Sequence, residues 1–97
     1  MNLSALSDSQ LLSNTENLVK EENRVLTQVL HHLLEIDRRR LFSSLGFSSL
    51  YEYANKKLGY PEDQAYRRIQ AMRALKVLPQ IEEKINSGAI SLTNLSL

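Results

Sequence analysis

Cysteine and tryptophan are absent from the 97 residues, and glycine and proline occur only three times and twice. The absence of cysteine excludes disulfides and thiolate metal sites, which is typical of a protein from a reducing compartment. Because few residues interrupt helices and leucine dominates the apolar residues, the composition favours helices in a single domain. The predicted fold class is all-α.

Long apolar runs are also missing. No run approaches the roughly 20 apolar residues that a membrane-spanning helix needs. The amino terminus lacks the basic start and apolar core of a signal peptide. We therefore expect a soluble, cytoplasmic protein that does not contact a membrane.

The net charge of +1 conceals a strongly segregated distribution. Residues 1–37 sum to −4, residues 38–76 sum to +6 from nine bases and three acids, and residues 77–97 sum to −1. A basic middle third predicts a local binding site for a polyanion such as nucleic acid. The alternative is chance clustering of charge on solvated helix faces.

Residues 15–45 contain no glycine or proline and carry a wide apolar stripe, which predicts one long scaffold helix. Residues 1–14 are expected to form a short helix capped by Ser7, or a frayed segment. At about 1.5 Å per residue, the long helix would extend for about 45 Å and overhang a compact domain. The overhang favours a homodimer whose interface would contain Leu18, Val25, Val29 and Leu33.

A compact cluster of shorter helices is predicted to follow the long one. Gly46 ends the long helix, and Gly59 forms the turn before the helix over residues 61–77. Pro61 suits the first turn of that helix because its missing N–H group is not needed there. The short helices are expected over residues 49–58, 61–77 and 79–87, with the start of another at 91.

Residues 49–77 have the parts of a helix-turn-helix: a short helix, the Gly59 turn and a second helix with a basic outer surface. In such a unit the second helix lies in the major groove, where its exposed donors reach phosphates and base edges. The alternative is an ordinary surface helix whose arginines pair with acids such as Asp37 or Glu52. The predicted DNA contacts are Gln64, Arg67, Arg68, Gln70, Arg73, Lys76, Lys56 and Lys57, with Gln64, Arg67 and Arg68 nearest the bases.

Five motifs together resemble a bacterial family. They are EIDRRRL at Glu35–Leu41, LGFSSLYEY at Leu45–Tyr53, LGY at Leu58–Tyr60, AYRRIQA at Ala65–Ala71 and GAISLT at Gly88–Thr93.

The family consists of HNH endonuclease-like proteins, and the resemblance is to the helical amino-terminal region that precedes their nuclease module. It covers about residues 15–97 and implies an HNH module further downstream. Because the sequence stops at Leu97, no catalytic residue of that module can be carried over. The resemblance therefore implies the targeting region of a nuclease-related protein.

The second half also resembles, more distantly, the helix-turn-helix of ParB-type partition proteins. In that pattern Ala54 is the inward alanine, Gly59 the turn and Ala65 a residue of the DNA-reading helix, followed by Leu78–Pro79 and the Gly88–Ser91 step. The chain has one extra residue before the glycine turn and about one extra helical turn before the Leu-Pro step. This resemblance also implies DNA binding.

No catalytic or metal site is predicted. His31 and His32 are adjacent, so on a helix they point about 100° apart and cannot share a metal ion by themselves. No phosphate-binding glycine loop and no nucleophile–base arrangement is visible. Among Arg38–Arg40 we expect one structural side chain and two exposed ones, and we expect the four tyrosines to pack between helices.

We therefore expect a non-catalytic DNA-binding module whose partner is double-stranded DNA. No cofactor and no small-molecule substrate are expected. The alternative is a helical homodimerisation or protein-interaction domain that uses the helix over residues 15–45.

Overall fold

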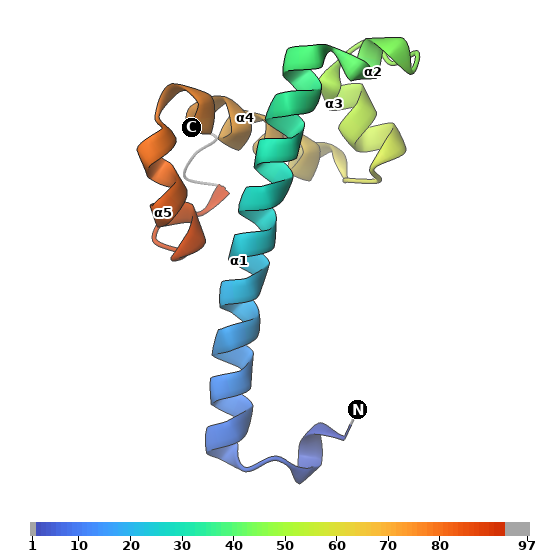
Figure 1. Ribbon diagram of the computed structural model, residues 1–97. Coiled ribbons are helices and arrows are strands. Elements are labelled where there is room, and N and C mark those ends of the chain that lie inside the picture. Colours follow the sequence, from blue (N-terminus) through green and yellow to red (C-terminus); the bar gives the residue numbers. More distant parts are fainter. Residues whose placement is uncertain (1, 93–97) are drawn as a thin grey trace.

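The computed structural model describes residues 2–92, and every regular element in that range is a helix (Figure 1). The α-helices are α1 (Asp8–Arg39), α2 (Leu41–Ser44), α3 (Leu50–Glu52), α4 (Glu62–Val77) and α5 (Glu82–Asn86). Short 3₁₀-helices are η1 (Leu3–Ala5) and η3 (Pro79–Ile81), and η2 (Tyr53–Lys57) is a π-helix. The predicted all-α fold class is confirmed.

Helix α1 begins seven residues earlier than the sequence predicts. Ser7 caps it, as expected, because its hydroxyl accepts from the Gln10 N–H at 3.2 Å and the Gln10 side chain accepts from the Ser7 N–H at 3.1 Å. This reciprocal capping box satisfies two backbone donors that the first helical turn leaves free. No break follows, so the expected short amino-terminal helix is the first part of α1.

Helix α1 also ends earlier than predicted, at Arg39 instead of residue 45. Arg40 adopts a left-handed backbone with φ 53° and ψ 38°, and its N–H donates to the carbonyl of Asp37 at 3.1 Å. This conformation turns the chain into α2 and is the usual way in which a helix terminates. Glycine generally occupies such a position, which is why the sequence pointed to Gly46 instead.

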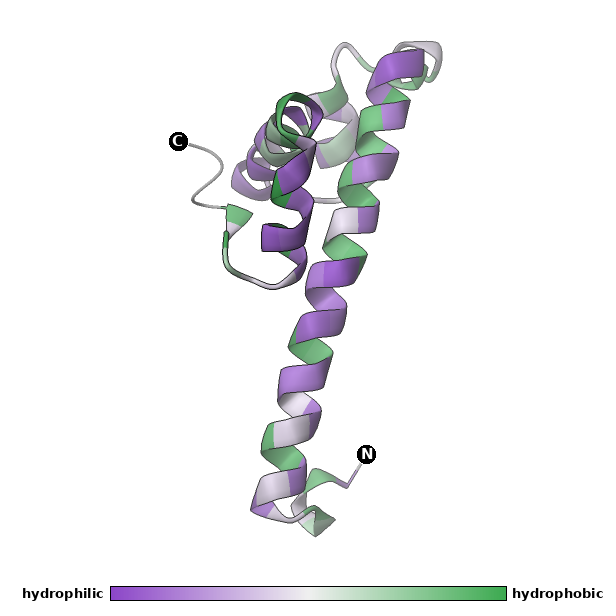
Figure 2. Ribbon diagram, turned by 60° about the vertical axis from the view of Figure 1, so that its left-hand side comes forward, coloured by the Kyte–Doolittle hydropathy of each residue, from purple (hydrophilic) through white to green (hydrophobic). Residues whose placement is uncertain are grey.

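The molecule is elongated because the amino-terminal part of α1 projects from the body. Its extents are 50 × 30 × 21 Å and its radius of gyration is 16.1 Å, against about 13 Å for a compact domain of 100 residues. The helices that follow α1 lie around its carboxyl-terminal part, whereas its amino-terminal part extends away from them and is preceded by η1 (Figure 1). Apolar positions recur along this projecting part (Figure 2), which we call the overhang and define as residues 8–18.

A single hydrophobic core lies where α1 crosses α4 and α5. Its most buried large side chains are Leu30, Leu33, Met72 and Ile85, each below 2 % exposed. The Thr27 hydroxyl, also buried, donates to Oδ1 of Asn86 at 2.6 Å and joins α1 to α5. Partly buried side chains complete the core, among them Leu26, Val29, Leu34, Ile36, Phe47, Tyr53 and Ile81.

Burial corrects one residue of the predicted dimer interface. Leu33 is 1 % exposed and belongs to the core, so it cannot contact a second chain. The wide apolar stripe concealed this, because it has one row facing the core and another facing outward. Leu18 and Val25 are 61 % and 54 % exposed, and Val29 is partly buried.

The shorter helices differ from the prediction mainly in type. Residues 49–58 form α3 and η2 in place of one α-helix, and residues 79–87 form η3 and α5. The helix predicted over residues 61–77 matches α4 to within one residue. Most of the helix predicted from residue 91 lies outside the described residues.

Within residues 2–92, none of the helices is both long and apolar enough to cross a membrane.

Candidate nucleic-acid interface

The unit α3–η2–turn–α4 has a turn fixed by backbone and side-chain hydrogen bonds. Ser49 caps α3 by accepting from the Glu52 N–H at 3.0 Å. Gly59 has a φ of 82°, which a residue without a Cβ atom adopts readily. The turn is closed by the Tyr60 N–H, which donates to the carbonyl of Ala54 at 3.2 Å, and by the Asn55 amide, which donates to the carbonyl of Tyr60 at 2.8 Å.

Buried residues occupy a wide sector of the surface of α4, so its polar residues do not lie together on one outer face. The buried residues are Ala65, Ile69, Ala71, Met72 and Leu75. Since successive residues turn by about 100°, Arg67, Arg68 and Arg73 point in directions about 100–140° apart. The exposed side of the helix is formed by Glu62, Asp63, Tyr66, Arg73 and Val77, with Gln70 partly buried beside them.

Arg68, predicted to lie nearest the bases, is partly buried and turned toward Tyr60. Its guanidinium carbon lies 4.2 Å from the centroid of the Tyr60 ring, and its Nη1 donates to the carbonyl of Gln64 at 3.4 Å. Its Nε atom is buried and has no hydrogen-bond partner within residues 2–92. Stacking over an aromatic ring stabilises a guanidinium in such a place.

Arg67 stays near the surface but is not free. Its Nη1 lies 3.7 Å from Oδ2 of Asp63, one helical turn earlier. The pairing of Arg67 and Arg68 with Asp37 or Glu52, proposed as the alternative, does not occur among the described residues.

The other predicted contacts are accessible. Lys56 and Lys57 lie at the exposed end of η2, and Arg73 and Lys76 lie in the carboxyl-terminal half of α4. Gln64 is exposed near the start of α4. The structure therefore brings the basic contacts of α4 to its carboxyl-terminal half rather than its start.

Two acids occupy the start of α4. Glu62 and Asp63 are exposed in its first turn, where they stabilise the positive end of the helix dipole. In a helix-turn-helix this end of the second helix contacts base edges. Carboxylates at that place repel phosphates, so the geometry disfavours insertion of the start of α4 into a groove.

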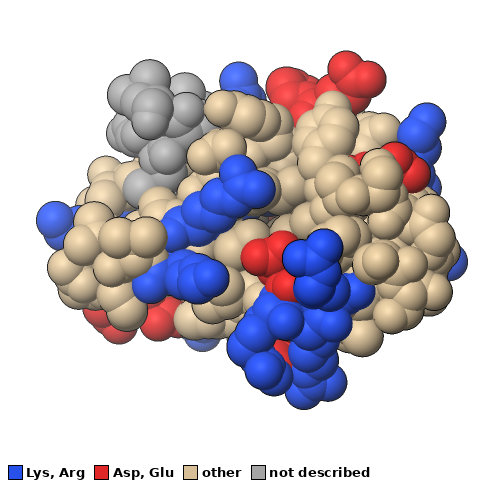
Figure 3. Space-filling model, turned by 90° about the horizontal axis from the view of Figure 1, so that it is seen from above, with Lys and Arg blue, Asp and Glu red and all other residues tan. Residues whose placement is uncertain are grey.

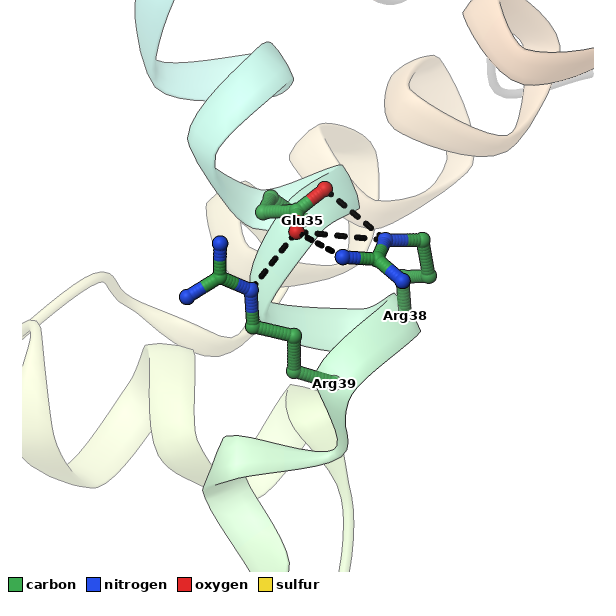
Figure 4. A network of polar contacts seen from close by, with 3 residues as sticks. All are labelled: Glu35, Arg38 and Arg39. Atoms are coloured by element: carbon green, nitrogen blue, oxygen red, sulfur yellow. Dashed lines mark hydrogen bonds and ion pairs between the residues drawn. The ribbon is translucent and has the colours of Figure 1, made fainter.

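A further basic cluster stands at the carboxyl-terminal end of α1. Glu35 accepts from both Arg38 and Arg39, one turn further along the helix (Figure 4). Arg38 and Arg39 remain 68 % and 58 % exposed in their side chains. Arg40 makes no ion pair within the described part of the chain, and its guanidinium lies 5.7 Å from the Phe42 ring centroid.

The protonation of this cluster follows from its contacts. Hydrogen bonds from Arg38 and Arg39 lower the pKa of Glu35 to about 2, and the hydrogen bond to Glu35 raises the pKa of Arg38. The carboxylate is therefore ionised at neutral pH, and the cluster of one acid and three bases keeps a net charge of +2. Seen along α1 from this end, Lys and Arg side chains gather densely around a few acidic atoms (Figure 3).

The roles predicted for Arg38, Arg39 and Arg40 agree only partly with the structure. Two of them bind Glu35 and all three are exposed, whereas one structural and two exposed side chains were expected. The i, i+3 and i, i+4 spacing of Glu35 with Arg38 and Arg39 was a legible signal for these ion pairs. Tyr66 is 50 % exposed beside the basic residues of α4, although the tyrosines were expected to pack.

The two histidines have ordinary partners. His31 Nε2 lies 2.8 Å from Oε1 of Glu82, joining α1 to α5, and His32 Nδ1 lies 2.6 Å from the carbonyl of Gln28. Within residues 2–92 no three His, Cys, Asp or Glu side chains are grouped so that they could hold a metal ion.

Comparison of the chain with family models, curated proteins and solved structures found no significant match.

Proposed function

We propose that this chain is a non-catalytic DNA-binding module that contacts the duplex mainly through its phosphates. The observation that carries the proposal is spatial. The basic segment, residues 38–76, forms α2, α3, η2 and α4 and gathers around one end of α1. The other end of α1, residues 8–22, carries four acids and one base.

The proposed contact surface joins two groups of exposed bases. The first is the cluster at the end of α1, Arg38–Arg40, and the second is the carboxyl-terminal half of α4. Lys56 and Lys57 extend the surface from η2. Long cationic side chains on one end of a small domain supply the electrostatic contacts that dominate affinity for DNA.

Direct reading of bases has a smaller role in this proposal. Arg68 stacks over Tyr60, and the start of α4 carries two carboxylates. Gln70 and Tyr66 remain on the outer side of α4, where they can reach a groove once the phosphates are bound. We therefore expect a weak sequence preference, as suits the targeting region of an HNH-nuclease-related protein.

The test compares two double variants by fluorescence anisotropy with duplex DNA across a salt series. In Arg73→Ala/Lys76→Ala, two phosphate contacts are lost, so the slope of log affinity against log salt should become about 2 units shallower. Lys20→Ala/Lys84→Ala removes the same charge from α1 and α5, outside the proposed surface, and serves as the control.

Both variants alter exposed side chains, and far-UV circular dichroism checks that they fold. An equal loss of affinity and slope in the two variants would reject the proposed surface and leave only non-specific attraction to net charge.

A further inference from the structure

The overhang exposes an apolar row that nothing in the described chain covers. Leu11, Leu12 and Leu18 are 38 %, 65 % and 61 % exposed. Leu11, Leu18 and Val25 are spaced by seven residues, so they lie almost in line on one side of α1. This row continues directly into the part of α1 that faces the turn before α4.

A groove continues the row along the body. One hollow of about 410 Å³ is lined by Leu18, Val25, Val29, Tyr60 and Arg68, together with Glu21, Glu22 and Leu26. A second, of about 420 Å³, shares Val25, Val29 and Tyr60 with the first and extends to Ile36, Tyr53 and Leu58. Because they share these residues, the two hollows form one apolar groove beside α1.

We propose that a second copy of this chain fills the groove, with its overhang lying antiparallel to α1. In this arrangement Leu18 of each copy lies against Val29 of the other, and Leu11 lies against Ile36. A two-fold axis near residues 23 and 24 relates the copies, so each groove receives the overhang of the other chain. Such an interface is self-complementary and closed, as in most homodimers.

Charge selects the antiparallel direction. Residues 8–22 of α1 carry four acids and one base, whereas Arg38–Arg40 stand at the other end of the same helix. The antiparallel pairing brings Asp8 of one copy to Arg39 of the other. It also brings Glu21 and Glu22 of one copy to the hollow of the other that Arg68 lines, and Arg68 has no ion pair within residues 2–92. A parallel pairing would bring the two acid-rich halves together.

The available surface is large enough for a stable pair. A standard interface uses about 20–30 residues and about 800 Å² on each partner. The stripe from Leu11 to Ile36 extends for about 38 Å along α1, and the wall formed by Tyr53, Leu58 and Tyr60 widens it. The proposed interface meets the proposed DNA surface at Arg39 and leaves the carboxyl-terminal half of α4 uncovered. Dimerisation is measured with protein alone.

The first test is sedimentation equilibrium of the full chain and two variants. Leu18→Lys places a charge in the proposed interface, and Val77→Lys makes the same change at a 75 % exposed position on the outer side of α4. We expect dimers for the wild type and Val77→Lys, and at least a tenfold weaker association for Leu18→Lys. Leu18 is exposed in the single chain, so its variant should fold, which circular dichroism verifies.

The second test measures whether the two α1 helices of the dimer are antiparallel or parallel. The chain lacks cysteine, so Ser9→Cys gives one spin label per chain at the start of α1. In the antiparallel dimer the two labels should be about 45 Å apart, whereas packed parallel helices would place them about 10 Å apart.

Three results would overturn the proposal. They are a wild type that stays monomeric at high micromolar concentration, a dimer unaffected by Leu18→Lys, and a short distance between the labels. Retained DNA binding by the Leu18→Lys variant would leave the DNA proposal intact in each case.

Discussion

Arg40 offers the sharpest test of how the long helix ends. Its backbone is left-handed, with a φ of 53°, although it carries a Cβ atom. For such a residue this conformation costs about 1–2 kcal/mol, because Cβ crowds the following carbonyl oxygen. Glycine avoids the crowding but loses about 0.5–1 kcal/mol through its larger freedom in the unfolded chain.

Two substitutions separate the backbone effect from the charge. Arg40→Ala removes the guanidinium and keeps Cβ, whereas Arg40→Gly removes both. The Arg40 N–H and C=O keep their hydrogen bonds to Asp37 and Ser43 in either variant. We expect the glycine variant to be more stable than the alanine variant by about 1 kcal/mol, which corresponds to about 4–8 °C in Tm for a domain of this size.

Thermal and urea unfolding followed by circular dichroism measure this difference. The sign of the result is decisive, because in an uninterrupted helix alanine is more stable than glycine by about 1 kcal/mol. An alanine variant more stable than the glycine variant would mean that one helix runs through residue 40, and it would refute the break between α1 and α2.

Three further predictions concern the contacts of single side chains. Because the pKa of Glu35 is lowered to about 2, the stability that its ionised carboxylate contributes is complete above about pH 4.5 and is lost as the pH falls through about 2. The unfolding free energy of Glu35→Gln should therefore depend less on pH between these values. A pH profile identical to that of the wild type would contradict the ion pairs. Thr27→Val keeps the side-chain shape but leaves the Asn86 side chain without its donor. Urea unfolding should therefore show an unfolding free energy lower by about 1–2 kcal/mol. A decrease below about 0.3 kcal/mol would mean that the Thr27–Asn86 hydrogen bond does not stabilise the fold. Arg68→Ala removes the stacking on Tyr60 and should lower stability by about 1 kcal/mol while leaving the affinity for DNA unchanged; a strong loss of affinity in the folded variant would return Arg68 to the DNA surface.

Local signals predicted the Ser7 cap and the turn before α4 well, although the long helix was expected to begin at residue 15. Ser7 with Gln10 is a capping pair that needs only three residues of sequence to read. Gly59 followed by Pro61 predicted the turn and the start of α4, because glycine permits a positive φ and proline fixes φ near the helical value. The predicted length of α1 was wrong, because the polar residues of its first turns gave no sign that they continue the helix that carries the apolar stripe.

Long-range packing could not be read from periodicity. The stripe on α1 contains an inner row and an outer row, and only the positions of α4 and α5 decide that Leu33 is inside and Val25 outside. Arg68 belongs to the inner side of α4 because its long side chain reaches Tyr60, a contact made across the turn. The left-handed backbone of Arg40 could not be predicted, because the residues around it favour a continuous helix.

The central proposal, binding to DNA through phosphates, is tested most directly by titrating a fluorescent duplex with the unmodified chain at several salt concentrations. If five or more phosphates are neutralised, the slope of log affinity against log salt should be about −4.5 or steeper. Absence of binding at low salt, or an affinity that does not change with salt, would contradict the proposal.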